Sequence, residues 1–183
     1  YGPGGDLIYT LGWGNGFLDR IRKGKALVSP GDGSALRAYC HAEDVARAFV
    51  QAAGNPRSYG QKYHVTGEEW LTWDRYFEII ADTMGKALPR LVHIPCEVLY
   101  AMAPGRLADV IENYRFNNIF DNQAARQDLD FRYTIPFSEG VRQTIAWLDE
   151  NQRIQNSDQD TFDDRIITTW DSRLAGFPLF ASE

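Results

Sequence analysis

The chain has 183 residues, a net charge of −6, 44% hydrophobic residues and 24% charged residues. This length and composition suffice for one globular domain with a hydrophobic core, and they exclude a disordered tail, a collagen-like chain and a repeat protein. The acidic balance argues against a dedicated nucleic-acid or anionic-membrane binder, because such proteins present basic surfaces to phosphate groups. Small molecules or proteins are the partners that this composition favours.

Cellular location is predicted from the cysteines and from the apolar runs. Cys40 and Cys96 are too few for a disulfide framework, and the sequence has no Asn-x-Ser/Thr acceptor. Apolar runs stay short of the ~20 residues that span a bilayer. We therefore expect a cytoplasmic protein without a membrane partner. The chain opens on Tyr1-Gly2-Pro3 without an initiator methionine, and we expect a fragment of a longer protein.

The first 40 residues predict a glycine-rich loop, one helix and two strands. Residues 1–15 are expected to be loop, and an amphipathic helix begins at Gly16 and ends at Gly24. Strands are predicted at 26–28 and 36–40, joined by a Pro-Gly-Asp-Gly turn. These strands suggest a unit resembling a β-hairpin.

Helices and short strands then alternate, which predicts an α/β fold. The helix that starts at Glu43 and Asp44 is expected to bury Val45, Phe49 and Ala52, which lie at helical spacing. The further elements expected are a strand at 62–65, a helix capped by Thr72 and ended by Gly85, a strand at 91–95, helices around 96–102 and 106–114, a strand at 118–120, a helix from Asp121 or Asn122 to Leu129, and a helix capped by Ser138.

The end of the chain changes composition after residue 149. Residues 150–160 are almost wholly polar and predict a linker between residues 1–149 and a tail. An amphipathic tail helix is expected over 161–183, because its apolar residues recur every four positions. We expect the tail to dock on the body of a longer parent protein or on a second subunit. The recurring apolar residues are Phe162, Ile166, Trp170 and Leu174.

The usual catalytic and cofactor motifs are absent from the sequence. It contains no G-x-G-x-x-G, P-loop or G-x-S-x-G pattern, and its glycine cluster at 12–16 has the spacing of a loop. The three histidines lie far apart, so a metal site is not expected. His41 lies near Glu43 and Asp44, where helix capping is the more common role than catalysis. No catalytic residue is assigned.

Arg37 is the residue of most interest, because it interrupts an apolar strand directly after a glycine-rich turn. A guanidinium there could offer two parallel donors to a phosphate, and the alternative is a salt bridge at a sheet edge. Arg115, which precedes Phe116 and Asn117, is a weaker case of the same kind, and a solvated surface arginine is its default interpretation.

Six stretches share motifs with one known family. They are residues 1–4 (Tyr-Gly-Pro-Gly), 20–25, 30–46 with its Pro-Gly-Asp-Gly turn, Arg37 and a His-Ala-Glu-Asp-Val-Ala run, 63–67, 71–72 and 122–131. They resemble the C-terminal half of the extended short-chain dehydrogenase/reductases, the NAD(P)-dependent epimerase/dehydratase family. The resemblance covers about residues 1–149. It implies an α/β fold that is the C-terminal substrate-binding portion of a Rossmann-type extended short-chain dehydrogenase/reductase.

The resemblance implies roles for four residues. Arg37 would clamp the diphosphate of a nucleotide sugar, Leu27 and Val28 would lie on the strand beside the base, and Arg115 would match a second phosphate-binding arginine. The parent protein would use NAD or NADP, held by a missing N-terminal Rossmann half. The resemblance also leaves open whether the protein forms a homodimer.

The residues that carry the chemistry of that family are missing from this sequence. None of the nine tyrosines is followed by a lysine at the fourth position, and the glycine loop for a dinucleotide is absent. We therefore expect that this chain alone binds no cofactor and is catalytically inert. The alternative hypothesis is a non-catalytic, reductase-like binding protein, either RNA-associated or structural.

Overall fold

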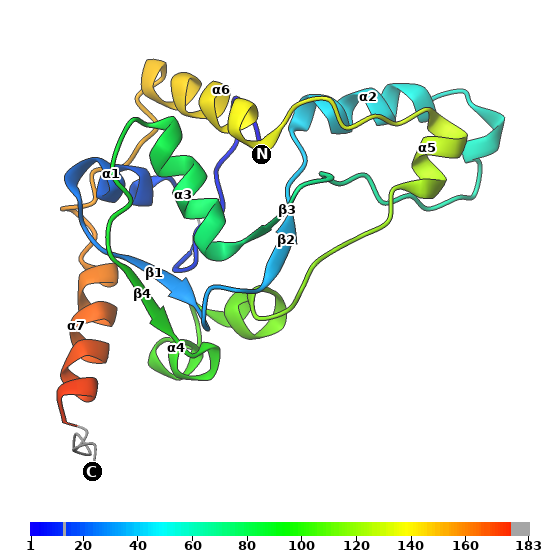
Figure 1. The fold of residues 1–183 in the computed structure, drawn as a ribbon. Coiled ribbons are helices and arrows are strands. Elements are labelled where there is room, and N and C mark those ends of the chain that lie inside the picture. The colour runs from blue at the N-terminus through cyan, green and yellow to red at the C-terminus, as the bar shows by residue number, and fades with distance from the viewer. Residues whose placement is uncertain (13, 177–183) are drawn as a thin grey trace, which may run out of the picture.

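Short strands alternate with helices along the chain, as the sequence predicts for an α/β fold. The computed structural model describes residues 1–12 and 14–176 (Figure 1). The elements in chain order are α1 (Gly16–Lys23), β1 (Leu27–Pro30), β2 (Leu36–Ala38), α2 (Ala42–Ala52), the 3₁₀ turn η1 (Pro56–Ser58), β3 (Trp70–Thr72), α3 (Trp73–Thr83), β4 (Leu91–Ile94), α4 (Cys96–Met102), the π-helical segment η2 (Val110–Tyr114), α5 (Gln123–Leu129), α6 (Phe137–Glu150) and α7 (Phe162–Ala175).

The four strands form two separate two-stranded sheets. β1 pairs in parallel with β4, with Val28 opposite Val92, and β2 pairs antiparallel with β3, with Arg37 opposite Leu71. The expected hairpin-like pairing of β1 with β2 is therefore wrong. β1 pairs with β4 instead, because every residue of β1 is buried and its partner must also lie inside the core.

Helix α3 forms the centre of the main core. Trp73, Phe77 and Ile80 on its apolar face are fully buried. The Thr72 hydroxyl accepts a hydrogen bond from the Arg75 amide at 3.1 Å, which confirms Thr72 as the N-cap. Gly85, with φ of 63°, follows the helix and confirms the predicted end.

Helices α2 and α5 form an arm that projects from the rest of the structure, at the upper right of Figure 1. The arm has a small core of its own, in which Ala48 of α2 packs with Ala125, Leu129 and Phe131. The prediction that Phe49 belongs to the buried face of α2 is wrong, because Phe49 is 74% exposed.

Three further expectations, two strands and the start of one helix, differ from the structure. Residues 62–65 form no regular strand and have no strand partner among the described residues. The expected strand at 118–120 is reduced to one bridge, between Asn118 and Arg37. Helix α6 begins at Phe137, before the expected cap Ser138, and the Glu69 carboxylate accepts a hydrogen bond from the Phe137 amide at 2.6 Å.

The tail helix α7 packs on this chain's own core. Phe162, Ile166 and Ile167 belong to the main core cluster, and α7 contacts β1. The tail helix was expected to dock on the body of the protein or on a second subunit, and α7 docks on the body formed by residues 1–149. Residues 177–183 of the expected tail helix lie outside the described residues. Within the part that the structure describes, no helix is both long and apolar enough to cross a membrane.

Two substitutions on α7 test its packing. Ile166 is 5% exposed and Leu174 is 49% exposed. Ile166→Ala is expected to lower the free energy of unfolding by about 2–4 kcal/mol, because it leaves a cavity under the helix. Leu174→Ala, the control, is expected to change it by less than about 0.5 kcal/mol. Urea unfolding measures both, and equal effects would contradict the packing.

Candidate anion-binding site

Arg37 lies in the middle of β2 and is 8% exposed. Its guanidinium carbon lies 5.3 Å from the centre of the Trp73 ring and 5.0 Å from that of Tyr114. The Trp73 indole donates a hydrogen bond to the Tyr114 carbonyl at 3.1 Å, which fixes one ring relative to the other. Two aromatic side chains therefore hold the cation in place.

The hydrogen bonds of Arg37 are incomplete. Nη1 donates to Asn113 Oδ1 at 3.2 Å, and the buried Nε has no partner among the described residues. Within that same part of the chain, no carboxylate forms an ion pair with Arg37. A buried charge without a counter-charge is costly, so its presence favours an anion that arrives from outside the chain.

A second polar group near Arg37 also lacks a partner. The Tyr39 hydroxyl is buried and has no hydrogen-bond partner in the described part of the chain. Burial raises the pKa of Tyr39, and the positive charge of Arg37 opposes this rise. The neutral hydroxyl can therefore donate to an anion that Arg37 holds.

Asn113 is a site residue that sequence reasoning missed. It belongs to the π-helical segment η2, and its Oδ1 accepts from Asn118 Nδ2 at 2.5 Å as well as from Arg37. The backbone amide of Asn118 in turn donates to the Leu36 carbonyl of β2 at 2.7 Å. The contact joins residues 76 positions apart, so no local pattern indicated it. A π-helical turn is often found at functional sites.

Arg115 does not join Arg37 in this structure. Its Nη1 lies 3.0 Å from Glu97 Oε1, and its guanidinium lies over the Phe116 ring at 5.1 Å. It lines a separate open hollow together with Asp32 and Trp170. The Glu97 carboxylate already neutralises this cation, so an anion binds there only in competition with it.

Leu27 and Val28 lie on β1 with both side chains fully buried. The Val28 amide donates to the Tyr9 hydroxyl at 3.3 Å. The side chains of Leu27 and Val28 therefore contact the core. The expectation that their strand lies beside a base stays a prediction.

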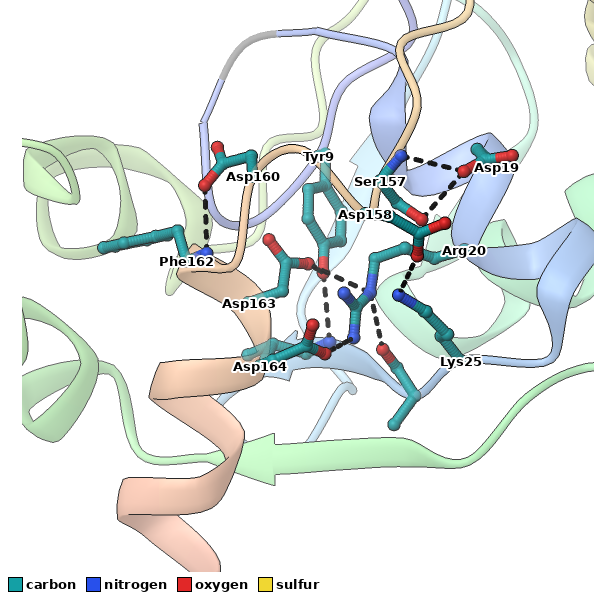
Figure 2. A network of polar contacts seen from close by, with 12 residues as sticks. Tyr9, Asp19, Arg20, Lys25, Ser157, Asp158, Asp160, Phe162, Asp163 and Asp164 are labelled. Carbon is teal, nitrogen blue, oxygen red and sulfur yellow. Dashed lines mark hydrogen bonds and ion pairs between the residues drawn. The ribbon is translucent and has the colours of Figure 1, made fainter.

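A buried polar network joins Tyr9 to α7 (Figure 2). The Tyr9 hydroxyl donates to Asp163 Oδ1 at 2.5 Å, and Arg20 Nε lies 3.4 Å from the same oxygen. Arg20 Nη2 donates to Asp164 at 2.7 Å. Burial raises the pKa of Asp163, while the hydrogen bond from Tyr9 and the charge of Arg20 lower it. The network thus fastens α7 beside β1.

The polar stretch expected as a linker is bound along α1. The amide and hydroxyl of Ser157 both donate to Asp19 at 2.8 Å. Asp158 pairs with Lys23 and Lys25, and these two lysines hold the pKa of Asp158 at about 2. Residues 155–158 therefore connect α6 to α7 along a path fixed by α1.

His41 and Cys40 carry structural roles. His41 is the N-cap of α2, where its Nδ1 accepts from the Glu43 amide at 3.3 Å. Burial lowers the pKa of His41 and raises that of Cys40 to about 11, so the imidazole is a weak base and the thiol is not a thiolate near pH 7. His41 itself is therefore the cap of α2, and the acids expected to cap the helix, Glu43 and Asp44, lie in its first turn. Among the described residues, no group of histidine, cysteine and acidic side chains is placed to hold a metal ion.

Comparison with known proteins bears on the family. Residues 1–66 match the model of the NAD dependent epimerase/dehydratase family. The resemblance to this family is thereby confirmed. The sterol-4-alpha-carboxylate 3-dehydrogenase erg26, decarboxylating, of Schizosaccharomyces pombe is 24% identical over 172 residues, which are 84% of this chain and 49% of that protein. The chloroplast stem-loop binding protein of 41 kDa b of Arabidopsis thaliana is 27% identical over 77 residues, 42% of this chain and 20% of that protein.

Solved epimerase structures share the fold. UDP-glucuronic acid 4-epimerase from Bacillus cereus, in complex with UDP-glucuronic acid and NAD, superposes with a TM-score of 0.62 at 17% identity, over 82% of this chain and 43% of that one. UDP-glucose 4-epimerase from Bifidobacterium longum, in complex with NAD+ and UDP, gives 0.55 at 15% identity, over 78% and 40%. The α/β fold therefore resembles that of Rossmann-type epimerases and dehydratases, and the chain spans half or less of the length of these relatives.

The network around Asp163 predicts a pH-dependent effect of Tyr9→Phe. The substitution leaves the buried carboxylate without its hydroxyl donor and is expected to lower the free energy of unfolding by about 1–3 kcal/mol at neutral pH. Because the pKa of Asp163 is raised in the folded state, the loss should shrink as the pH falls through that raised value and the carboxyl becomes neutral. Urea unfolding at several pH values measures this, and a loss that does not vary with pH would contradict it.

Proposed function

We propose that this chain is the C-terminal, substrate-binding portion of an NAD(P)-dependent nucleotide-sugar epimerase/dehydratase-like enzyme. Arg37 receives the diphosphate of the substrate. The family match, the epimerase fold and the unpaired cation at Arg37 support this proposal. The catalytic half lies outside this sequence.

The observation that carries the proposal is the state of the Arg37 guanidinium. It is buried between two aromatic rings with one hydrogen bond, and no carboxylate of the described residues pairs with it. A guanidinium matches a phosphate group with two parallel hydrogen bonds, and partial exclusion of water strengthens them. Asn113 binds Nη1, and Nε is left without a partner among the described residues.

The described residues of this chain do not fit the family's dinucleotide cofactor. The glycine cluster at 12–16, which precedes α1, follows no strand, and the Asn15 amide there is already bonded to Gln155 Oε1 at 2.7 Å. The sequence also has no Tyr-x-x-x-Lys pair. Binding of NAD or NADP and proton transfer are therefore assigned to the other half of the parent protein.

Substitution of Arg37 tests the proposal by calorimetric titration of the chain with UDP. Arg37→Met keeps an unbranched apolar stem between the two rings and removes the charge. We expect it to weaken UDP binding by about 10- to 150-fold, the value of a charge-assisted phosphate contact of about 1.5–3 kcal/mol. Arg75→Ala is the control, because Arg75 is an exposed arginine paired with Glu78, and it should leave binding unchanged.

Asn113→Asp gives the second arm of the same test. The new carboxylate would lie where Asn113 Oδ1 accepts from Arg37 and would supply the missing counter-charge. UDP affinity should fall as in Arg37→Met, while the melting temperature should rise or stay level. Equal UDP affinity in the wild-type protein, Arg37→Met and Asn113→Asp would contradict the proposed role.

A further inference from the structure

Helix α7 uses its acidic and its basic residues differently. Its three aspartates form ion pairs with arginines of α1 and of the segment before β4, and Figure 2 shows two of these aspartates beside Arg20. The two basic residues of the helix, Arg165 and Arg173, are exposed and form no ion pair with any residue that the structure describes. The acids of α7 therefore hold the helix in place, and its bases stay open to another molecule.

The two arginines line one hollow between α7 and α4, at the lower left of Figure 1. The hollow has a volume of about 560 Å³, and Met102 of α4 together with Phe162 and Ile166 of α7 forms the apolar part of its lining. The guanidinium carbon of Arg165 lies 5.8 Å from the centre of the Phe162 ring, an arrangement that orients the cation. The hollow thus combines an apolar lining with two cations, and we call it the α4–α7 groove.

The spacing of the arginines sets the length of the ligand that fits. Arg165 and Arg173 are eight positions apart on α7, which is about 12 Å along the helix axis. An extended chain rises about 3.3 Å per residue, so its residues i and i+4 lie about 13 Å apart. The side chains at i, i+2 and i+4 also point to the same face of an extended chain. Two acids at i and i+4 can therefore reach the arginines while an apolar side chain at i+2 enters the groove.

Charge complementarity favours a protein segment over a nucleic acid as the occupant. The chain has a net charge of −6, so a long polyanion is repelled by most of its surface. A nucleic acid presents a phosphate at every nucleotide and needs a larger basic surface than two arginines. The apolar lining of Met102 and Ile166 also has no counterpart in a phosphate backbone. A short segment with two carboxylates matches both features of the groove.

We propose that the α4–α7 groove binds an extended acidic segment of a partner protein, with the pattern acidic-x-apolar-x-acidic. The groove lies on α4 and α7, whereas the candidate anion site lies on β2, α3 and η2. The proposal therefore goes beyond the proposed function and does not depend on it.

The test titrates the ¹⁵N-labelled chain with the peptide acetyl-Gly-Glu-Thr-Leu-Thr-Glu-Gly-amide and follows the binding by NMR. The Nε–H signals of Arg165 and Arg173 should move. A peptide with glutamine in place of both glutamates should bind at least about 5-fold more weakly, because it loses two charge pairs. A peptide with serine in place of leucine should also bind more weakly, because it loses the apolar contact.

Variants of the protein give the second arm of the test. Arg165→Glu and Arg173→Glu should each weaken binding of the glutamate peptide at least about 5-fold, because each puts a like charge opposite a carboxylate. Arg57→Glu is the matched control. Arg57 is an exposed arginine in η1, without an ion pair in the described part of the chain, and its reversal changes the net charge equally. It should leave the peptide affinity nearly unchanged.

Four outcomes would overturn the proposal. These are equal affinity for the glutamate and glutamine peptides, equal affinity of Arg165→Glu and Arg57→Glu, a 12-nucleotide oligouridylate that binds more tightly than the peptide and loses affinity in Arg165→Glu, and a homodimer of this chain that Arg165→Glu dissociates while the peptide does not bind. UDP affinity should stay level in Arg165→Glu, so the failure of either proposal is distinguishable from the failure of the other.

Discussion

The buried cation at Arg37 is the constraint around which the candidate site is built. Its guanidinium is held by Trp73 at the start of α3, by Tyr114 at the end of η2 and by the Asn113 amide. Two elements distant in sequence from β2, α3 and η2, thus converge on one charge that neither of them neutralises. An interior of this kind is stable only if the cost of the unpaired charge is offset by the aromatic core around it. The aromatic core therefore also allows the Arg37 guanidinium to keep its positive charge without a paired carboxylate.

The rest of the structure consists of a main body and an arm, and apolar residues of the arm are exposed. In the body, α7 is fastened to β1 through Tyr9, Asp163 and Arg20, and residues 155–158 are bound along α1. In the arm, α2 has an uncovered apolar face and residues 62–65 have no strand partner among the described residues.

Local patterns predicted most elements, and contacts between distant residues explain the errors. Capping by Thr72 and the glycine after α3 are local, and both were found. The pairing of β1 with β4 joins residues about 64 positions apart, as in Leu27 with Leu91, and the turn at 30–33 favoured a hairpin instead. Arg37 was found because a charge in an apolar strand is visible in the sequence. Asn113 was not, since its role depends on a long-range contact.

The most direct measurement follows the Arg37 Nε–H signal by NMR while UDP is added, with uridine as the ligand that lacks phosphate. In the free protein this group is buried without a hydrogen-bond partner among the described residues. If Arg37 holds the diphosphate, the signal moves strongly with UDP and hardly at all with uridine. An Nε–H signal that stays in place at saturating UDP, or that moves equally with uridine, would contradict the role of Arg37.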